Sequence, residues 1–123
     1  MHVLFVDDDA ALVRLGMLRW TRLGYQVTGC ESPQEALERF RDHPVDFDVV
    51  VTDLSMPGMS GMELARQLLS LRPALPIILI SGQFGPEDAA EAQRVGIRWS
   101  IVKSEAFEQI PLRLQELLPS APL

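Results

Sequence analysis

Cysteine is nearly absent from this chain of 123 residues, in which Cys30 is the only cysteine. A single cysteine cannot form an internal disulfide, which excludes a disulfide-stapled secreted fold and fits a reducing, cytoplasmic environment. No other residue pattern in the chain supports a catalytic thiol. We therefore expect Cys30 to be a small buried apolar residue.

Long apolar runs and a surplus of basic residues are also missing. No apolar run approaches the ~20 residues of a membrane-spanning helix. The start, MHVLFVDDDA, has neither the basic segment nor the small-residue cleavage site of a signal peptide. The formal net charge is −6. Nucleic-acid binding relies on clustered Lys and Arg, so we expect neither a direct nucleic-acid partner nor membrane contact for this domain.

Apolar residues, in contrast, are plentiful. They make up 47% of the chain, which is typical of a globular protein with an ordinary core. A length of 123 residues suits one domain. We expect a single domain over residues 1–123, in which the Pro- and Ala-containing segment 119–123 is a frayed end or the stub of a linker.

Strand-like and helix-like segments alternate five times along the chain. The strand-like segments are short and apolar or β-branched, and segments with helical spacing of apolar residues follow them. The expected strands are 3–6, 25–30, 49–53, 77–80 and 99–102, and the expected helices are 10–23, 33–43, 61–71, 87–95 and 107–117. Such alternation implies right-handed crossovers and an α/β fold whose parallel sheet is covered on both faces.

Capping signals mark several of the helix starts. Ser32 with Glu35, and Ser60 with Glu63, each form a capping box. Asp9 is the expected N-cap of the first helix. That helix should bury one apolar stripe, formed by Leu12, Val13, Gly16, Met17, Trp20 and Leu23.

The last two helices carry weaker signals. The stripe of 87–95 consists mainly of Ala89, Ala92 and Val95, and weakly packed elements are often the ones that move. The last helix should begin near Phe107, because Pro111 is tolerated only in a first turn, where no backbone donor is needed.

Polar residues of chemical interest end four of the five strands: Asp7 with Asp8, then Asp53, Ser81 and Lys103. The carboxyl ends of parallel strands lie at one edge of a sheet, so these side chains should converge. Carboxylates in one cleft repel each other, and Mg²⁺ resolves this because it favours carboxylates, a backbone carbonyl and waters. Lys103 suits a phosphoryl oxygen. The group therefore predicts transfer of a phosphoryl group to Asp53.

Each residue of this group, taken alone, would be interpreted as having a structural role and no chemical one. An Asp directly after a strand is by itself most often a turn residue, so the prediction depends on the combination. Outside the group, we interpret His2 and His43 as surface residues. The methionines of the loop after Asp53 could form a partner surface, but packing of the loop is the preferred interpretation. They are Met56, Met59 and Met62.

The motifs VLFVDDD, VVVTDLSMPGMSG, ILISG and IVK resemble, in order and spacing, the receiver domain of two-component response regulators. The resemblance covers essentially the whole chain. It implies a CheY-like, flavodoxin-like (βα)5 fold, in which five helices flank a five-stranded parallel sheet of order 2-1-3-4-5. The chain is also similar to receivers at the C-terminus of hybrid sensor histidine kinases.

The resemblance assigns the chemistry to particular residues. Asp53 would accept phosphate from a phosphohistidine on a histidine kinase or a histidine phosphotransfer protein. Asp7 and Asp8 would be the acidic pair that holds Mg²⁺ together with Asp53, and Ser55 would add a backbone carbonyl. Lys103 would contact the phosphate and assist its transfer.

The resemblance also implies a switch and a class of protein. Ser81 would be the hydroxyl that turns toward the phosphate and alters the surface formed by 87–95, 99–102 and 107–117, where a downstream protein binds. The domain would be a signalling module that phosphorylates and slowly dephosphorylates itself, not an enzyme. Kinase activity would reside elsewhere in a hybrid chain, and a homodimer is a further option.

Three departures from the family pattern matter. Ser104 stands where the family usually has a proline after the lysine, so we expect either a trans bond with a shifted loop or a strained cis bond. Ser100 stands at the position of the usual switch aromatic, with Trp99 on the other face of the strand. Gly82 and Gln83 after the serine favour a more mobile loop.

Two alternative functions compete with a phosphoacceptor. A pseudo-receiver would use the same fold as a binding module and would never be phosphorylated. A haloacid-dehalogenase-type phosphohydrolase would use Asp7 and Asp9 after the first strand with Ser81 and Lys103. The chain is short for such a hydrolase, lacks its acidic motif after Lys103, and leaves the Asp53 loop unexplained.

Overall fold

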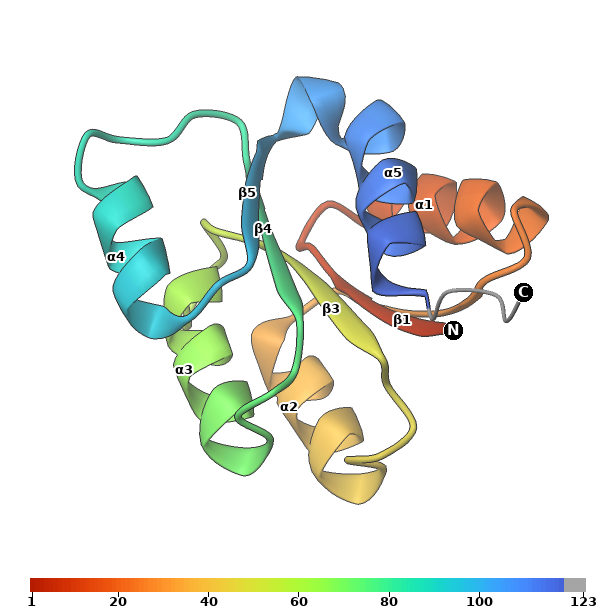
Figure 1. The fold of residues 1–123 in the computed structure, drawn as a ribbon, viewed down its shortest axis with the longest axis horizontal. Helices are drawn as coiled ribbons and strands as arrows, with labels where there is room; N and C mark the ends of the chain where they lie inside the picture. Colours follow the sequence, from red (N-terminus) through yellow and green to blue (C-terminus); the bar gives the residue numbers. More distant parts are fainter. Residues whose placement is uncertain (119–123) are drawn as a thin grey trace, which may run out of the picture.

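The protein is described by a computed structural model that covers residues 1–118, in which strands and helices alternate (Figure 1). The strands are β1 His2–Val6, β2 Gln26–Cys30, β3 Val49–Asp53, β4 Ile77–Ser81 and β5 Trp99–Val102. The helices are α1 Ala10–Arg22, α2 Pro33–Asp42, α3 Gly61–Leu71, α4 Asp88–Val95 and α5 Ala106–Leu117, and a short 3-10 helix, Lys103–Glu105, precedes α5. The expected alternation is confirmed. The expectation for 119–123 lies outside the described residues.

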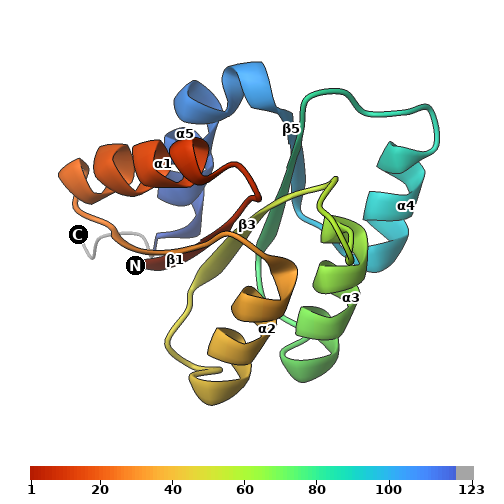
Figure 2. The ribbon, with the colours of Figure 1, turned by 180° about the vertical axis from the view of Figure 1, so that it is seen from behind.

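All five strands are parallel and lie in the order β2-β1-β3-β4-β5, as the sequence predicted. Helices α1 and α5 cover one face, and α2, α3 and α4 cover the other (Figures 1 and 2). Every residue of β3 and β4 is buried, because helices cover both faces of these central strands. Within residues 1–118, no helix is long and apolar enough to cross a membrane.

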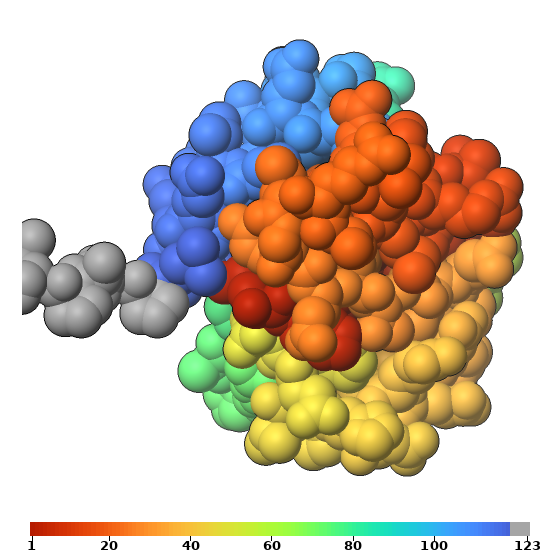
Figure 3. Space-filling model, turned by 90° about the vertical axis from the view of Figure 1, so that its right-hand side faces the viewer, coloured from red at the N-terminus to blue at the C-terminus, as the bar shows by residue number. Residues whose placement is uncertain are grey.

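The two faces of the sheet carry separate cores. Under α1 and α5, the Trp20 ring lies 4.8 Å from the Phe5 ring and 6.0 Å from the Phe107 ring, measured between centroids. The contact between Trp20 and Phe107 joins α1 to α5, and the two helices lie side by side in the space-filling view of this side (Figure 3). On the other face, Leu37 and Phe40 of α2 and Leu64 of α3 belong to one buried cluster.

A third, smaller cluster lies under α4. We call it the α4 cluster: its buried members are Met62, Leu79 and Ala92, and Leu54, Phe84, Val95 and Ile97 pack around them. Ala92 is the only residue of α4 that is buried, and Ala89, which was expected in the buried stripe, is exposed. The expectation of weak packing for this helix is therefore confirmed.

The predicted capping residues all occupy their positions. The Asp9 carboxylate accepts hydrogen bonds from the backbone N–H groups of Ala11 and Leu12 at the start of α1. The hydroxyls of Ser32 and Ser60 each accept a hydrogen bond from the N–H three residues later, at the starts of α2 and α3. These bonds pair donors that a helix start otherwise leaves free.

Two helix predictions were wrong in detail. Leu23, assigned to the buried stripe of α1, is 59% exposed, because it is the C-cap residue at which the chain leaves the helix. The expected start near Phe107 is confirmed to within one residue, because α5 begins at Ala106, but Pro111 lies in its second turn, not the first. The carbonyl of Phe107 therefore lacks the N–H donor that residue 111 would normally provide.

His2 lies outside the polar group at the strand ends, as expected, but it is a surface residue only in part. Its side chain is half-buried: Nε2 lies 2.7 Å from Thr28 Oγ1, and the ring packs 4.6 Å from the Phe47 ring. The pattern around His2 gave no sign of these partners, which are distant in sequence. His43, in contrast, is exposed as expected.

Candidate functional site

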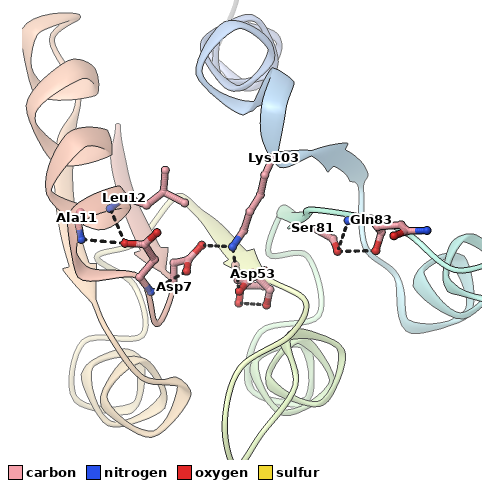
Figure 4. Close-up of polar contacts among 9 residues, drawn as sticks. Asp7, Ala11, Leu12, Asp53, Ser81, Gln83 and Lys103 are labelled. Atoms are coloured by element: carbon pink, nitrogen blue, oxygen red, sulfur yellow. Dashed lines mark hydrogen bonds and ion pairs between the residues drawn. The ribbon is translucent and has the colours of Figure 1, made fainter.

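Three strand ends bring acids and a lysine to the carboxyl edge of the sheet. Asp7 directly follows β1, Asp53 is the last residue of the adjacent β3, and Lys103 directly follows β5. The Lys103 ammonium reaches back across the edge and lies 3.0 Å from Asp7 Oδ2 and 3.2 Å from Asp53 Oδ2 (Figure 4). Residues that are far apart in sequence therefore form one ionic group, as the sequence predicted.

Asp8 completes the acidic part of this group. One carboxylate oxygen from each of Asp7, Asp8 and Asp53 lies within 4.8 Å of the others. Asp7 and Asp53 are buried, whereas Asp8 is exposed. The site is therefore open to solvent on the side of Asp8 and closed behind the other two acids.

The electrostatics of the site follow from this burial. Burial is the main cause that raises the pKa of Asp7 above its usual value of 3.8, partly offset by a hydrogen bond from the Asp9 N–H and by Lys103. Burial, followed by the charge of Asp7, also raises the pKa of Asp53. Burial lowers the pKa of Lys103, but the negative charges and hydrogen bonds of Asp7 and Asp53 outweigh this effect, so that the pKa of Lys103 is raised. Lys103 is therefore charged at neutral pH.

The acidic group fits a hard divalent cation. Asp7 Oδ2 is buried and has the Lys103 ammonium, at 3.0 Å, as its ion-pair partner, and no other group in residues 1–118 donates a hydrogen bond to it. A buried carboxylate oxygen with unused acceptor capacity, next to two more carboxylates, has the oxygen-donor chemistry that Mg²⁺ favours. Ser55, two residues after Asp53, is exposed and lines a hollow of about 730 Å³ beside the site.

The backbone after Asp53 is held tightly. The Leu54 N–H donates to the Ile80 carbonyl at 2.8 Å, and the Gly61 N–H donates to the Leu54 carbonyl at 2.8 Å. A Cβ atom at Gly61 would lie only 2.1 Å from the Asp53 carbonyl oxygen, so no other residue fits without displacing the loop. In the sequence, Gly61 is only the first residue of the expected helix 61–71. Its close approach to Asp53 could not be inferred without the fold.

Ser81 lies at the same edge, at the end of β4 beside β3, and is buried. Its hydroxyl donates to the Gln83 carbonyl at 2.8 Å and accepts from the Gln83 N–H at 3.2 Å (Figure 4). The sequence predicted the position of Ser81, but not the backbone turn that engages its hydroxyl. Gln83 is therefore the main contributor to the site that sequence reasoning missed.

Two departures from the family pattern, Ser100 and Ser104, lie in β5 and in the segment that follows it. Residues 1–118 contain no cis peptide bond, so the Lys103–Ser104 bond is trans and the chain enters the 3-10 helix at this point. Ser100 is exposed. Trp99 faces α5, where the guanidinium groups of Arg98 and Arg113 lie 5.0 and 5.4 Å from its ring. No aromatic side chain of β5 therefore faces α4.

Other residues singled out in the sequence have structural roles. Cys30 is buried, and burial raises the pKa of its thiol to about 12, which leaves it un-ionised at neutral pH. Met56 and Met62 are buried and Met59 packs against the core, in agreement with loop packing.

Known proteins with similar sequences are response regulators. The two-component response regulator PhoP of Pseudomonas aeruginosa is 33% identical over 118 residues, which cover 96% of this chain and 52% of that protein. The transcriptional regulatory protein GlrR of Escherichia coli is 36% identical over 96 residues, which cover 78% of this chain and 21% of that protein. The chain thus spans between about a fifth and a half of these relatives.

Solved structures agree with the sequence relatives. The chemotaxis protein CheY4 of Vibrio cholerae superposes with a TM-score of 0.86 at 28% identity, over 95% of this chain and 98% of that one. The response regulator protein TrrA of Thermotoga maritima, solved in complex with Mg²⁺-BeF, gives 0.83 at 26% identity, with the same coverage. The family model of the response regulator receiver domain matches residues 3–115. This chain therefore belongs to the response regulator receiver domain family, the signalling domains of two-component systems.

Proposed function

We propose that this chain is one phosphoacceptor domain over residues 1–123, in which Asp53 takes a phosphoryl group from a phosphohistidine. The donor would be a histidine kinase or a histidine phosphotransfer protein. An Asp53 carboxylate oxygen attacks phosphorus, the P–N bond to the imidazole breaks, and its electron pair stays on the nitrogen. The observation that carries this proposal is the Lys103 ammonium, placed between Asp7 and Asp53, whose carboxylates lie close to that of Asp8.

The acidic group would hold Mg²⁺ through Asp7, Asp8 and Asp53, with the backbone carbonyl of Ser55 as a further ligand. When bound, the ion would neutralise charge that builds up on the phosphoryl oxygens. The buried Asp7 Oδ2 supports this assignment, because Lys103 is its single polar partner in residues 1–118 and the oxygen can accept a second contact.

Lys103 would bind a phosphoryl oxygen and keep Asp53 reactive. A nucleophilic carboxylate must be ionised, but burial and Asp7 both raise the pKa of Asp53. The nearby positive charge of Lys103 opposes this effect. The same ammonium is within reach of a group bonded to Asp53, where it would stabilise the charge of the transition state.

Phosphorylation would be read out through Ser81. Its hydroxyl would turn from Gln83 to the phosphate and shift a pre-existing equilibrium between two states. The surface formed by α4, β5 and α5 would then change its affinity for a downstream protein. The domain would act in the cytoplasm as a signalling module, either as a stand-alone regulator or at the end of a hybrid kinase. Self-phosphorylation and slow self-dephosphorylation would be its only chemistry, with a homodimer as one option for its assembly.

The hydrolase alternative meets a specific obstacle at Asp9. A phosphohydrolase of that type would need this carboxylate beside the nucleophile, but Asp9 caps α1 through the N–H groups of Ala11 and Leu12. The pseudo-receiver alternative is separated from an active receiver by experiment.

Beryllofluoride, which mimics an acyl phosphate, provides that experiment. With Mg²⁺ present, beryllofluoride should raise the free energy of unfolding of the protein. The increase should be about 2.7 kcal/mol when the beryllofluoride concentration is a hundred times its Kd. Omission of Mg²⁺ or the Asp53→Asn substitution should abolish the effect. An absence of stabilisation in the wild-type protein would favour the pseudo-receiver.

A further inference from the structure

We propose that Phe84 is a positioning residue that holds the Ser81 hydroxyl away from Asp53 and couples movement of that hydroxyl to α4. The inference depends on the proposed function, because it concerns how the phosphoacceptor site is switched. It assigns to a loop residue the coupling that an aromatic residue of β5 cannot provide in this chain.

The first observation is the state of Ser81. Both hydrogen bonds of its hydroxyl go to the backbone of Gln83, one donated to the carbonyl and one accepted from the N–H. The hydroxyl can reach a group on Asp53 only if both bonds break. The position of Gln83 therefore determines how readily Ser81 turns.

The second observation is what anchors Gln83. Its own side chain is exposed, as are Gly82 and Gly85, so these residues give the loop few packing contacts. Phe84, the next residue, is half-buried and packs against the α4 cluster. Because it is bonded directly to Gln83, an anchored Phe84 fixes the turn that holds the hydroxyl.

The third observation is what the α4 cluster supports. Ala92 is the only buried residue of α4 and belongs to this cluster. Leu54, which directly follows Asp53, packs on the same cluster. Leu54, next to the phosphoacceptor, and Phe84, three residues after the switch serine, therefore both contact the small apolar group on which α4 depends.

The fourth observation excludes the alternative route through β5. Ser100 pairs with Leu79 of β4 but is small and exposed, so it cannot follow the movement of Ser81. Trp99 packs with the core on the opposite face of the sheet, next to α5. A movement of Ser81 is transmitted to α4 through Gln83 and Phe84 along the chain.

The test measures beryllofluoride affinity in the presence of Mg²⁺ for the full chain and its variants. Phe84→Ala frees the Gln83 turn and should tighten binding about fivefold, at the low end of typical couplings between sites. Phe84→Leu keeps an apolar anchor and should bind like the wild type. Trp99→Leu, a matched change of a half-buried aromatic on the other face, should leave the affinity unchanged. Equal affinities for Phe84→Ala and wild type, or an equal gain for Trp99→Leu, would overturn the inference.

A second measurement needs no ligand. Amide hydrogen exchange of the free protein should speed up over residues 83–95 in Ser81→Ala and in Phe84→Ala, and the double variant should add little to either. Exchange in β3 and β4 should stay slow, which checks that the variants fold. If the wild type fails to bind beryllofluoride, the proposed function is wrong, and hydrogen exchange alone then tests the coupling between Ser81 and Phe84. Additive effects of Ser81→Ala and Phe84→Ala on exchange, or effects on different amides, would contradict this coupling.

Discussion

At the scale of single residues, Asp7 and Asp53 are two buried carboxylates that share one ammonium group. The sequence predicted their meeting with Lys103, because each ends a strand of a parallel sheet and the topology brings such ends together. It did not predict that the Ser81 hydroxyl would be engaged by Gln83, because that depends on backbone dihedrals in a loop of polar and glycine residues. The sequence therefore predicted where these side chains lie at the sheet edge, but not how the Ser81 hydroxyl is oriented.

The raised pKa values of Asp7 and Asp53 predict how the free energy of unfolding depends on pH when divalent cations are absent. The pKa values of Asp7 and Asp53 are raised above 3.8, so the folded protein binds more protons than the unfolded chain just above that pH. The free energy of unfolding should therefore fall as pH rises from 3.8 through the raised values, and the loss should persist at neutral pH.

Asp7→Asn removes one of these charges. Without Mg²⁺, the variant should be more stable than the wild type at neutral pH, by about 1 kcal/mol, and its stability should depend less on pH. Urea denaturation at mildly acidic and neutral pH measures both quantities. A variant that is less stable at neutral pH would show that the ion pair with Lys103 outweighs the repulsion.

Lys103→Met removes the only cation within ion-pair distance of Asp53 among residues 1–118. The initial rate of phosphorylation by acetyl phosphate should fall about 100-fold, which is typical for loss of one preorganised group that stabilises transition-state charge. Lys103→Arg keeps the charge but not the geometry of the ammonium, and should lose less. An unchanged rate in Lys103→Met would remove this residue from the proposed mechanism.

At the scale of elements, the β3–α3 loop shows how closely packed backbone fixes a side chain. The capping box at Ser60 and Glu63 made the start of α3 predictable. The start of α5 was predicted to within one residue although no side chain caps it, but the prediction that Pro111 lies in the first turn was wrong. Local hydrogen bonds leave a sequence signature, whereas contacts between distant segments, such as Gly61 with Asp53, do not.

Gly61→Ala tests the close approach in this loop. The new Cβ would lie 2.1 Å from the Asp53 carbonyl oxygen. The loop must move, and we expect a loss of about 1–3 kcal/mol in the free energy of unfolding, together with slower phosphorylation. Gly82→Ala is the matched control, because a Cβ there meets no atom within 4 Å. Equal stability of the two variants in urea denaturation would contradict the steric explanation.

At the scale of the whole molecule, strand order is what makes the site. Placing β1 beside β3 and β4 beside β5 brings polar residues from four strands to one edge. The alternation of strands and helices predicted this parallel topology, and the motifs predicted the order. The α4 cluster was not predicted, because Leu54, Phe84 and Ala92 come from three separate segments and follow no common periodicity.

The most direct test of the account is to locate the phosphoryl group after incubation with acetyl phosphate and Mg²⁺. The account predicts one phosphoryl group on Asp53 in the wild-type protein, identified by mass spectrometry after chemical trapping of the acyl phosphate. Labelling should be lost without Mg²⁺ and in Asp53→Ala. Label on Asp7, or label that persists in Asp53→Ala, would contradict the assignment of Asp53 as the phosphoacceptor.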